Sequence, residues 1–449
     1  MRDKIETDGC MNLNREKILG LLFLLSALPT AVQAQLHYVT NNGTITITAY
    51  DCTNGSGGAV IIPITTNGLL VTDIGNTAFA SRTCLTSITI PDSIASIGSD
   101  AFSYCTSLTN VTIGIGVTNI GNTAFRGCSS LTNVAIPSSV TRIGSGAFGY
   151  CTSLTAVTVN TNNPAYVSIA GVLFDKTQTM LIQYPGGKVG GYTVSSSVIS
   201  ILNDAFSGCT GLKNIVIPNS VISIGSFAFA QCGSLTNVII PDSVKYLEGY
   251  AFYKCSSLAS VTIGNGVTNI ANSTFSFCTS LTSVTIPNSV TSIASGAFYL
   301  CSQLTNVTLP GSVANIGLLA FQNCYALTGI YFHGNAPSVI STAFAGDNAT
   351  IIYYLPGTTG WSNTFAGRPT VLWNPQAQAN DASFGVRTNR FGFNITGSSN
   401  LVIVVETCTN LTNPAWSPVS TNALTGGSSY FSDSQWTNHT TGFYRFRSP

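Results

Sequence analysis

The sequence SLTNVTIGIGVTNIGNTAFRGCS at residues 107–129 is followed directly by SLTNVAIPSSVTRIGSGAFGYCT at residues 130–152, a second copy of one 23-residue pattern. The phenylalanine of its AF or TF pair recurs every 23 residues along the chain, apart from one step of 58 residues. The series comprises Phe79, Phe102, Phe125, Phe148, Phe206, Phe229, Phe252, Phe275, Phe298, Phe321 and Phe344. A repeat of this length predicts a solenoid, in which each unit buries its apolar side chains against its neighbours.

One unit of the repeat is LTSVTIPNSVTSIASGAFYLC at residues 281–301. Val284 and Ile286 alternate with Thr285, which predicts a short strand with one face inward. Pro287 ends the strand and turns the chain. Phe298 and Cys301 lie three residues apart, the spacing of one helical or 3-10 turn. Stacked copies would therefore form a parallel sheet with ladders of equivalent residues.

These units resemble the BspA-type leucine-rich repeats of bacterial surface proteins. The segments IPNSVTSIASGAF (residues 286–298) and IPSSVTRIGSGAF (residues 136–148) carry the resemblance, which covers about residues 60–344. It implies a leucine-rich-repeat solenoid, a parallel β-sheet with short helical or 3-10 turns. It also implies adhesion to host, neighbouring-cell or matrix molecules, or interaction at the cell envelope.

Segments outside the repeats predict further domains. Residues 35–59 are expected to form an N-terminal β cap, and residues 60–374 the repeats, with a hairpin-bearing long unit at about residues 160–192 and a C-terminal cap at about residues 345–374. Over residues 375–449 the 23-residue step is lost, and short strands with Gly, Ser and Asn turns predict a small β-sandwich-like module. This tail resembles a module on secreted proteins of Verrucomicrobia-like bacteria. Its role, envelope attachment or an inert cap, stays open.

The N-terminal segment has the pattern of a secretory signal peptide over residues 1–34. Arg15 and Lys17 precede an apolar run at residues 18–28, and Val32 and Ala34 provide small residues before a cleavage point. The apolar run is too short to cross a bilayer, and no later stretch suits a membrane span. The sequence therefore predicts a secreted or cell-surface protein, and it leaves open whether translation starts at Met1 or Met11.

Composition and charge exclude several classes of protein. Charged residues make up 7% of the 449 residues and the formal net charge is +1, whereas about 25% charged residues is typical. Such a surface offers no basic field for nucleic acid. Hydrophobic residues make up 44%, which suffices for a folded core.

Residues that could carry catalysis or bind a metal are sparse. The three histidines, His37, His333 and His439, fall in separate modules, so a zinc site or a histidine triad would need partners from distant segments. Asp92 and Asp242 occupy a turn position that other copies fill with Asn, which indicates turn formation. We expect no catalytic residue, metal or cofactor, and a polysaccharide-active enzyme, which needs clustered carboxylates, is the disfavoured alternative.

Cysteines follow the same 23-residue step. The regular ladder comprises Cys105, Cys128, Cys151, Cys209, Cys232, Cys255, Cys278, Cys301 and Cys324, and Cys84 is a displaced first member. Equivalent side chains of stacked coils point in parallel, which suits a disulfide poorly, so these ten residues are expected to be buried, reduced thiols. Cys52 and Cys408 lie outside the ladder and are either free or paired.

Two repeat positions are candidates for binding. The residue before the ladder cysteine varies freely between copies, whereas the outward strand position forms a polar stripe rich in threonine. The candidate residues are Tyr104, Tyr150 and Phe277 at the first position, and Thr112, Thr262, Thr285 and Thr308 at the second. Aromatic residues are common on recognition surfaces, although neutral drift on an exposed loop explains the first position equally well. We expect a monomeric, non-enzymatic scaffold that binds a protein or glycan outside the cell, and the alternative is an envelope-associated structural protein without a specific ligand.

Overall fold

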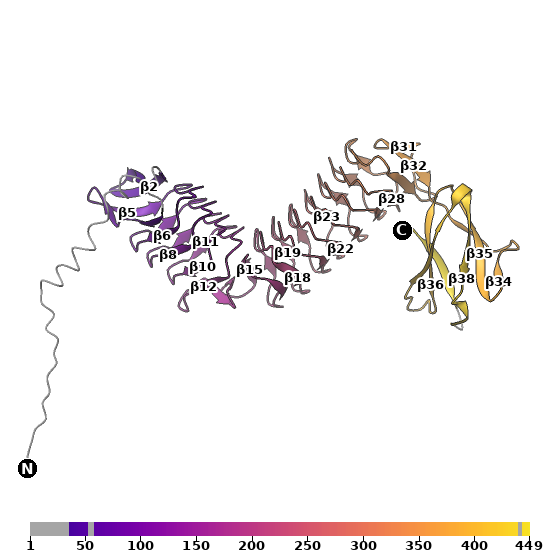
Figure 1. Cartoon of the computed structure of the whole chain (residues 1–449), viewed down its shortest axis with the longest axis horizontal. Helices are drawn as coiled ribbons and strands as arrows, with labels where there is room; N and C mark the ends of the chain where they lie inside the picture. The colour runs from indigo at the N-terminus through magenta and orange to yellow at the C-terminus, as the bar shows by residue number, and fades with distance from the viewer. Residues whose placement is uncertain (1–35, 53–57, 439–441) are drawn as a thin grey trace, which may run out of the picture. The chain divides into compact units, whose positions relative to one another are not determined.

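The computed structural model describes residues 36–52, 58–438 and 442–449. The expected signal peptide at residues 1–34 and His439 lie outside these residues. The chain divides into two compact units between Gly171 and Val172. Short parallel strands stack coil on coil in each unit, and the second unit ends in a module of longer strands (Figure 1). Helix in the described part of the chain is limited to the 3-10 turns η1 (Thr425–Gly427) and η2 (Trp436–Asn438).

Each 23-residue copy forms one coil with a longer and a shorter strand. In β8 (Asn110–Ile113), Val111 and Ile113 are buried, whereas Asn110 and Thr112 are exposed. This is the alternation expected of a strand with one face on the core. A turn then leads to a two-residue strand, such as β9 (Asn119–Ile120).

In the first unit, the other longer strands are β3 (Ala59–Ile61), β6 (Ser87–Ile90), β10 (Asn133–Ile136) and β12 (Ala156–Val159), and the other shorter ones are β7 (Ser96–Ile97) and β11 (Arg142–Ile143). In the second unit, the longer strands are β16 (Gly190–Thr193), β18 (Leu212–Val216), β20 (Asn237–Ile240), β22 (Ser260–Ile263), β24 (Ser283–Thr285), β26 (Asn306–Leu309), β28 (Gly329–Phe332), β30 (Ile351–Tyr354) and β32 (Arg368–Leu372). The shorter ones are β17 (Ser200–Ile201), β19 (Ser223–Ile224), β21 (Tyr246–Leu247), β23 (Asn269–Ile270), β25 (Ser292–Ile293), β27 (Asn315–Ile316) and β29 (Ser338–Val339).

Equivalent strands of neighbouring coils pair in parallel, and each residue pairs with the residue 23 positions further along the chain. Val238 of β20 pairs with Val261 of β22, which pairs with Val284 of β24. The turn segments are also tied between coils, because Phe229 N donates to Ala251 O at 2.7 Å. Each coil therefore supplies hydrogen-bond partners for the next, and the predicted parallel leucine-rich-repeat solenoid is confirmed.

The repeated phenylalanines form the core of each unit. All of them are at most 1% exposed. In the first unit the ring of Phe102 stacks on that of Phe125, with 5.0 Å between centroids. In the second unit Phe229 stacks on Phe252 at 5.0 Å, and Tyr184 stacks on Phe206 at 4.9 Å. Burial of one such ring stabilises the fold by about 1.5–3 kcal/mol, so these columns hold neighbouring coils together.

The ladder cysteines lie beside the phenylalanine columns. The nine regular members are buried and form no disulfide. Cys128 Sγ donates to Phe102 O at 3.2 Å, and Cys255 Sγ donates to Phe229 O at 3.1 Å. Burial raises the pKa of the Cys105 thiol to about 12, which keeps it protonated and unreactive. The prediction of buried, reduced thiols is confirmed for these nine residues.

The prediction that Cys84 is a reduced thiol of the ladder is wrong. Cys84 forms a disulfide with Cys52, with 6.2 Å between the Cα atoms. The first repeat places two additional residues between Phe79 and its cysteine, which moves Cys84 out of the column. The Cα separation then falls within the range that a disulfide spans. Cys408, in the tail, is free and buried.

The 58-residue step contains an antiparallel hairpin. Strand β14 (Val172–Asp175) pairs with β15 (Met180–Gln183), and β15 also pairs in parallel with β17. The hairpin strand β15 therefore takes the place of a coil strand at the start of the second unit. The strand β13 (Tyr166–Ile169), at the end of the first unit, also lies within this step.

Other strands close the ends of the repeat array. At the N-terminal end, β1 (Leu36–Asn41) pairs antiparallel with β2 (Thr44–Tyr50), which pairs in parallel with β5 (Leu69–Ile74). Strand β4 (Thr65–Thr66) folds against β5. At the other end, β30 and β32 extend the parallel ladder, and β31 (Thr364–Phe365) folds back onto β32.

The tail consists of two antiparallel sheets that share a core. One contains β33 (Gln376–Gln378), β34 (Gly385–Arg387), β35 (Arg390–Thr396) and β38 (Ser428–Asp433), and the other β36 (Val402–Cys408), β37 (Ser417–Ala423) and β39 (Phe443–Arg447). Phe393, Val405 and Phe431 are buried in this core together with Tyr331 and Tyr353 of the last coils. The predicted β-rich tail is thus present, and it packs on the final repeats.

Candidate binding surface

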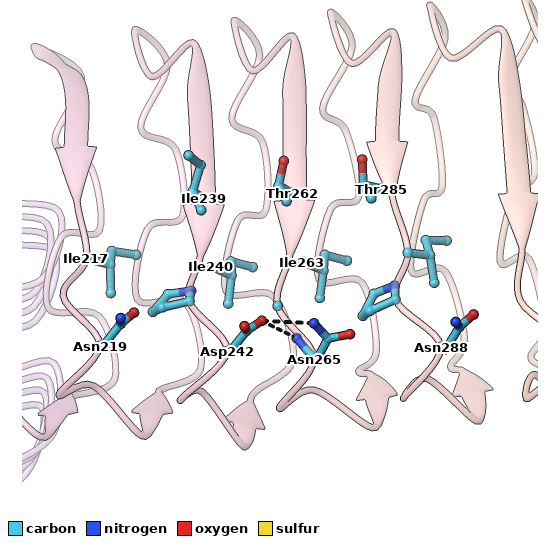
Figure 2. Close-up of a pocket in the computed structure, with 14 residues that line it drawn as sticks. Ile217, Asn219, Ile239, Ile240, Asp242, Thr262, Ile263, Asn265, Thr285 and Asn288 are labelled. Atoms are coloured by element: carbon cyan, nitrogen blue, oxygen red, sulfur yellow. Dashed lines mark hydrogen bonds between the residues drawn. The ribbon is translucent and has the colours of Figure 1, made fainter. Parts of the chain in front are cut away.

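The outward positions of the longer strands line up as one stripe on the strand face. In the second unit, Ile239, Thr262 and Thr285 lie in register on β20, β22 and β24 (Figure 2). The two threonines are exposed, and Ile239 is 69% exposed. In the first unit, Thr112 pairs with the equivalent residue of β6 and is exposed.

A shallow groove of about 530 Å³ runs beside this stripe across four coils of the second unit. Its floor is formed by isoleucines such as Ile240 and Ile263, which are almost fully buried. The opposite edge is a row of short polar side chains, one from each coil, as Figure 2 shows. The row consists of Asn219, Asp242, Asn265 and Asn288. A ligand in this groove would meet the exposed side chain of Ile239 and polar side chains on both edges, with Asp242 as the single charged group of the lining.

Asp242 joins two neighbouring coils at this edge. Its Oδ1 accepts the backbone N–H of Asn265 at 2.7 Å and the Nδ2 of the same residue at 3.2 Å. The next coil approaches closely here, because a Cβ on Gly264 would lie 2.5 Å from the carbonyl carbon of Pro241. A side chain at position 264 would therefore push the two coils apart.

The first unit repeats the same construction. Asp92 Oδ1 accepts the N–H of Ile115 at 2.8 Å, and a Cβ on Gly114 would lie 2.6 Å from the carbonyl carbon of Pro91. A second groove, of about 470 Å³, follows along the strand face and includes Thr112 in its lining. The two aspartates were predicted to form turns, and their hydrogen bonds to the following coil add a role that this prediction did not include. The signal lay in the pairing of each Pro-Asp coil with a following Gly-x-Gly coil.

Thr308 does not share the exposure of the other threonines in the stripe. It is half-buried, and its Oγ1 lies 3.1 Å from Ser448 Oγ in the tail. The next two positions of the stripe are Tyr331 and Tyr353, which are stacked at 4.6 Å between centroids and buried under the tail. The structure therefore brings Thr262 and Thr285 together in one groove, and it leaves Thr308 only partly exposed beside the tail.

The three aromatic candidates lie at turns, and none of them lines either groove. Each has a left-handed backbone, with φ of 57° at Tyr104, 58° at Tyr150 and 61° at Phe277. Tyr104 is 51% exposed and lies over Gly127 of the next coil, where a Cβ would be 2.6 Å from its ring. The guanidinium of Arg126 lies 4.6 Å from the ring centroid of Tyr150.

Titratable groups in the described residues are scattered. No group of three His, Cys, Asp or Glu side chains among them is placed to hold a metal ion. His37 Nε2 contacts Asp51 Oδ2 at 2.7 Å on the surface, and burial lowers the pKa of His333. Burial also raises the pKa of Asp347 to about 7, and its carboxylate oxygens have no hydrogen-bond partner in the described chain.

The two 3-10 turns of the tail are short, at three residues each. Among residues 36–52, 58–438 and 442–449, no helix has the length and apolar character needed to cross a bilayer.

The chain matches known repeat proteins over most of the solenoid. The family model for the BspA type leucine-rich repeat region (6 copies) matches residues 72–189, 187–285 and 223–351. No curated protein sequence matches the chain. Among solved structures, a leucine-rich repeat protein from Eubacterium ventriosum is 26% identical with a TM-score of 0.59, over 75% of this chain and 98% of that one.

Two further solved structures are similar in sequence. A leucine rich cell surface protein from Faecalibacterium prausnitzii is 27% identical over 67% of this chain and 94% of that one, with a TM-score of 0.43. A leucine-rich repeat protein from Bacteroides ovatus is 25% identical over 76% and 98%, with a TM-score of 0.41. Because the family model spans more than half of the chain, this protein belongs to the family of BspA-type leucine-rich repeat proteins.

Proposed function

We propose that the chain is a non-enzymatic binding scaffold of the cell surface or extracellular space, which holds a protein or glycan along the strand-face groove. The observation that carries this proposal is the recurrence of the groove. Both units contain one on the strand face. In the second unit its lining includes the paired Pro-Asp and Gly-x-Gly coils, and in the first unit it lies on the strands of the Gly-x-Gly coil and the two coils after it. Other copies of the repeat, such as the one with Pro287 and Asn288, form their turns without this pairing.

The lining of the groove suits an elongated ligand of low charge. Exposed Ile239 offers apolar contact, and the threonine and asparagine side chains offer hydrogen bonds at each coil. Coils follow one another at about 4.8 Å, so a ligand that lies across them meets the same set of groups repeatedly. Many weak contacts of this kind add up to specific binding when the surface is rigid.

Export from the cytoplasm is part of the proposal. The disulfide between Cys52 and Cys84 supports it, because disulfides persist in oxidising compartments. The basic and apolar pattern of the N-terminal segment gives independent support. Cell fractionation of the full chain, beside a variant that ends at residue 374, should find the full chain outside the cytoplasm. Accumulation of the full chain in the cytoplasm would contradict export.

Binding is tested with the chain from residue 35 onward on arrays of glycans and extracellular-matrix proteins. The double variant Thr262→Arg and Thr285→Arg fills the groove with bulk and charge without touching the core. We expect it to lose about tenfold or more in affinity. Gln303→Arg, at an exposed position outside the groove, is the matched control and should bind as the wild type does. A folded chain that binds nothing on either array would favour the ligand-free structural alternative.

The absence of catalysis is tested separately. The same protein is incubated with a panel of polysaccharides, and new reducing ends or unsaturated products are measured. We expect none above the buffer blank. Product formation that survives repurification would refute the non-enzymatic assignment.

A further inference from the structure

Five aromatic side chains form a continuous row on the turn segments of four consecutive coils in the second unit. We call this row, Phe227, Tyr250, Tyr253, Phe277 and Tyr299, the aromatic ribbon. Centroid distances between successive rings are 4.6, 5.7, 5.6 and 5.4 Å, the first pair being stacked and the other three edge-to-face. Tyr250 is 37% exposed and the other four are partly buried. The rings therefore fix one another in place while remaining accessible to solvent.

Three of the five ribbon residues lie at backbone positions that disfavour aromatic side chains. Phe227 and Tyr250 precede the core AF pairs with φ of 56° and 61°, and Phe277 precedes a ladder cysteine with φ of 61°. Bulky side chains are strained in this left-handed region, which glycine, asparagine and aspartate tolerate. The other coils with positive φ at the first position carry Thr77, Asp100, Thr123, Gly146, Asp204, Ser273, Gly296 and Leu319. The left-handed turn is therefore common to the repeat, and the fold does not require an aromatic side chain at this position.

A single cation lies within the ribbon. The ammonium of Lys254 is 5.2 Å from the ring centroid of Tyr253 and 5.4 Å from that of Phe277. Lys254 is exposed and forms no ion pair with any residue of the described chain. The two rings hold the ammonium in position by cation–π attraction, and its hydrogen-bond donors are left for an anionic ligand group.

The tyrosine hydroxyls of the ribbon are also available. Those of Tyr250, Tyr253 and Tyr299 form no hydrogen bond within the described residues. Aromatic faces, hydroxyl groups and one ordered ammonium together suit a ligand that has rings with apolar C–H faces, many hydroxyls and occasional carboxylates. Sugar rings stack on aromatic side chains through their C–H faces, and a carboxylate is the natural partner of the ammonium.

We propose that the aromatic ribbon is a binding site for a polysaccharide that carries uronic acid residues. Successive sugar rings lie along the ribbon, and one carboxylate accepts hydrogen bonds from the ammonium of Lys254. The ribbon runs over three coil steps of about 4.8 Å, which gives room for a short run of sugar residues. This site adds to the proposed binding role of the chain and uses a surface separate from the strand-face groove.

The test measures binding of the chain from residue 35 onward to polygalacturonate, alginate and hyaluronate by biolayer interferometry. Two probes serve as chemical controls. Fully methyl-esterified polygalacturonate keeps the sugar rings and removes the charge, and polyglutamate keeps the charge and removes the rings. We expect binding to at least one uronate polymer, about tenfold weaker binding to the ester, and none to polyglutamate. Absence of binding to all three uronate polymers, or equal binding of polyglutamate, would overturn the proposal.

The repeats themselves supply substitutions that are compatible with the fold. Tyr250→Ser and Phe277→Gly install residues that other coils carry at the same positions, Ser273 and Gly208. Each should keep the wild-type melting temperature within a few degrees and weaken uronate binding about tenfold. Lys254→Gln installs the residue that the preceding coil carries at the same position, Gln231, and should bind the acid and the ester equally. Tyr325→Thr removes a 61% exposed aromatic ring outside the ribbon and should change nothing.

Groove variants separate this proposal from the previous one. The Thr262→Arg and Thr285→Arg double variant should bind the uronate polymer as the wild type does, because the threonines are not part of the ribbon. If the groove variant alone lost uronate binding, the ligand would belong to the groove and the ribbon proposal would be wrong. Suppose instead that the ribbon variants lost uronate binding and that the groove variant bound every array ligand as the wild type does. Only the groove proposal would then fail.

Discussion

Replacement of Phe252 by alanine tests the central physical claim about the solenoid. Phe252 has no solvent exposure. Its ring stacks on Phe229 at 5.0 Å with an interplanar angle of 1°, and on Phe275 at 5.5 Å with an angle of 9°. The backbone N–H of Phe252 donates to Thr274 O at 2.9 Å, and this bond does not depend on the side chain. The substitution therefore removes packing while the ladder of hydrogen bonds stays intact.

The expected cost follows from the hole that the ring leaves. Truncation of a buried phenylalanine to alanine costs about 3–5 kcal/mol. Loss of two stacked pairs, each worth about 0.5–1.5 kcal/mol beyond burial, places Phe252→Ala near 4–5 kcal/mol. Phe252→Leu keeps most of the volume and should cost about 1–2 kcal/mol. Tyr325→Thr, at an exposed ring, should change the free energy of unfolding by less than about 0.5 kcal/mol.

Urea unfolding followed by circular dichroism gives the three free energies. Hydrogen exchange then locates the effect, because a repeat array loses stability first around the weakened coil. Protection should fall most at the coils of Phe229 and Phe275. A cost below about 1 kcal/mol for Phe252→Ala, or a cost equal to that of Tyr325→Thr, would refute the view that stacked rings hold the coils together.

Three other predictions follow from the turns, the sulfur chemistry and a buried carboxyl group. Gly264→Ala places a Cβ 2.5 Å from the backbone of the preceding coil and should lower the free energy of unfolding, measured by urea titration, by more than about 2 kcal/mol. The control is Gly233→Ala, whose Cβ would lie 3.7 Å from the nearest atom, and it should be close to neutral. Cys52 and Cys84 are 32 residues apart, and reduction of their disulfide should lower the free energy of unfolding by about 3–4 kcal/mol. The ladder thiols should react with iodoacetamide only after unfolding, as mass spectrometry can show. Burial raises the pKa of Asp347 to about 7, so the neutral carboxyl group favours the folded state. This stabilisation is complete below the ordinary aspartate pKa and is lost as the pH rises through about 7. Asp347→Asn should flatten thermal stability between pH 4 and pH 8, and an unchanged pH profile would contradict the shift.

The sequence alone determined the repeat and what lies inside it. A 23-residue step fixes which side chains of each coil face the core, because Phe, Leu and Cys must meet their own equivalents when identical coils stack. The burial of the phenylalanine series and of the nine regular ladder cysteines follows from this rule. The parallel strands and the β-rich tail were predictable for the same reason, since alternation and turn residues are local signals.

Only the tertiary structure decided which outward residues are accessible and which of them meet. Thr308 looks like Thr285 in the sequence, yet a contact with Ser448, 140 residues away, places it beside the tail. The disulfide likewise joins Cys84 of the first repeat to Cys52 of the preceding N-terminal segment, and the aromatic ribbon joins residues from different repeat positions. The physical reason is that the repeat specifies packing within the core, where every coil must satisfy the same neighbours. The surface carries no such constraint, so its contacts depend on the path of the chain between coils and on where the tail packs.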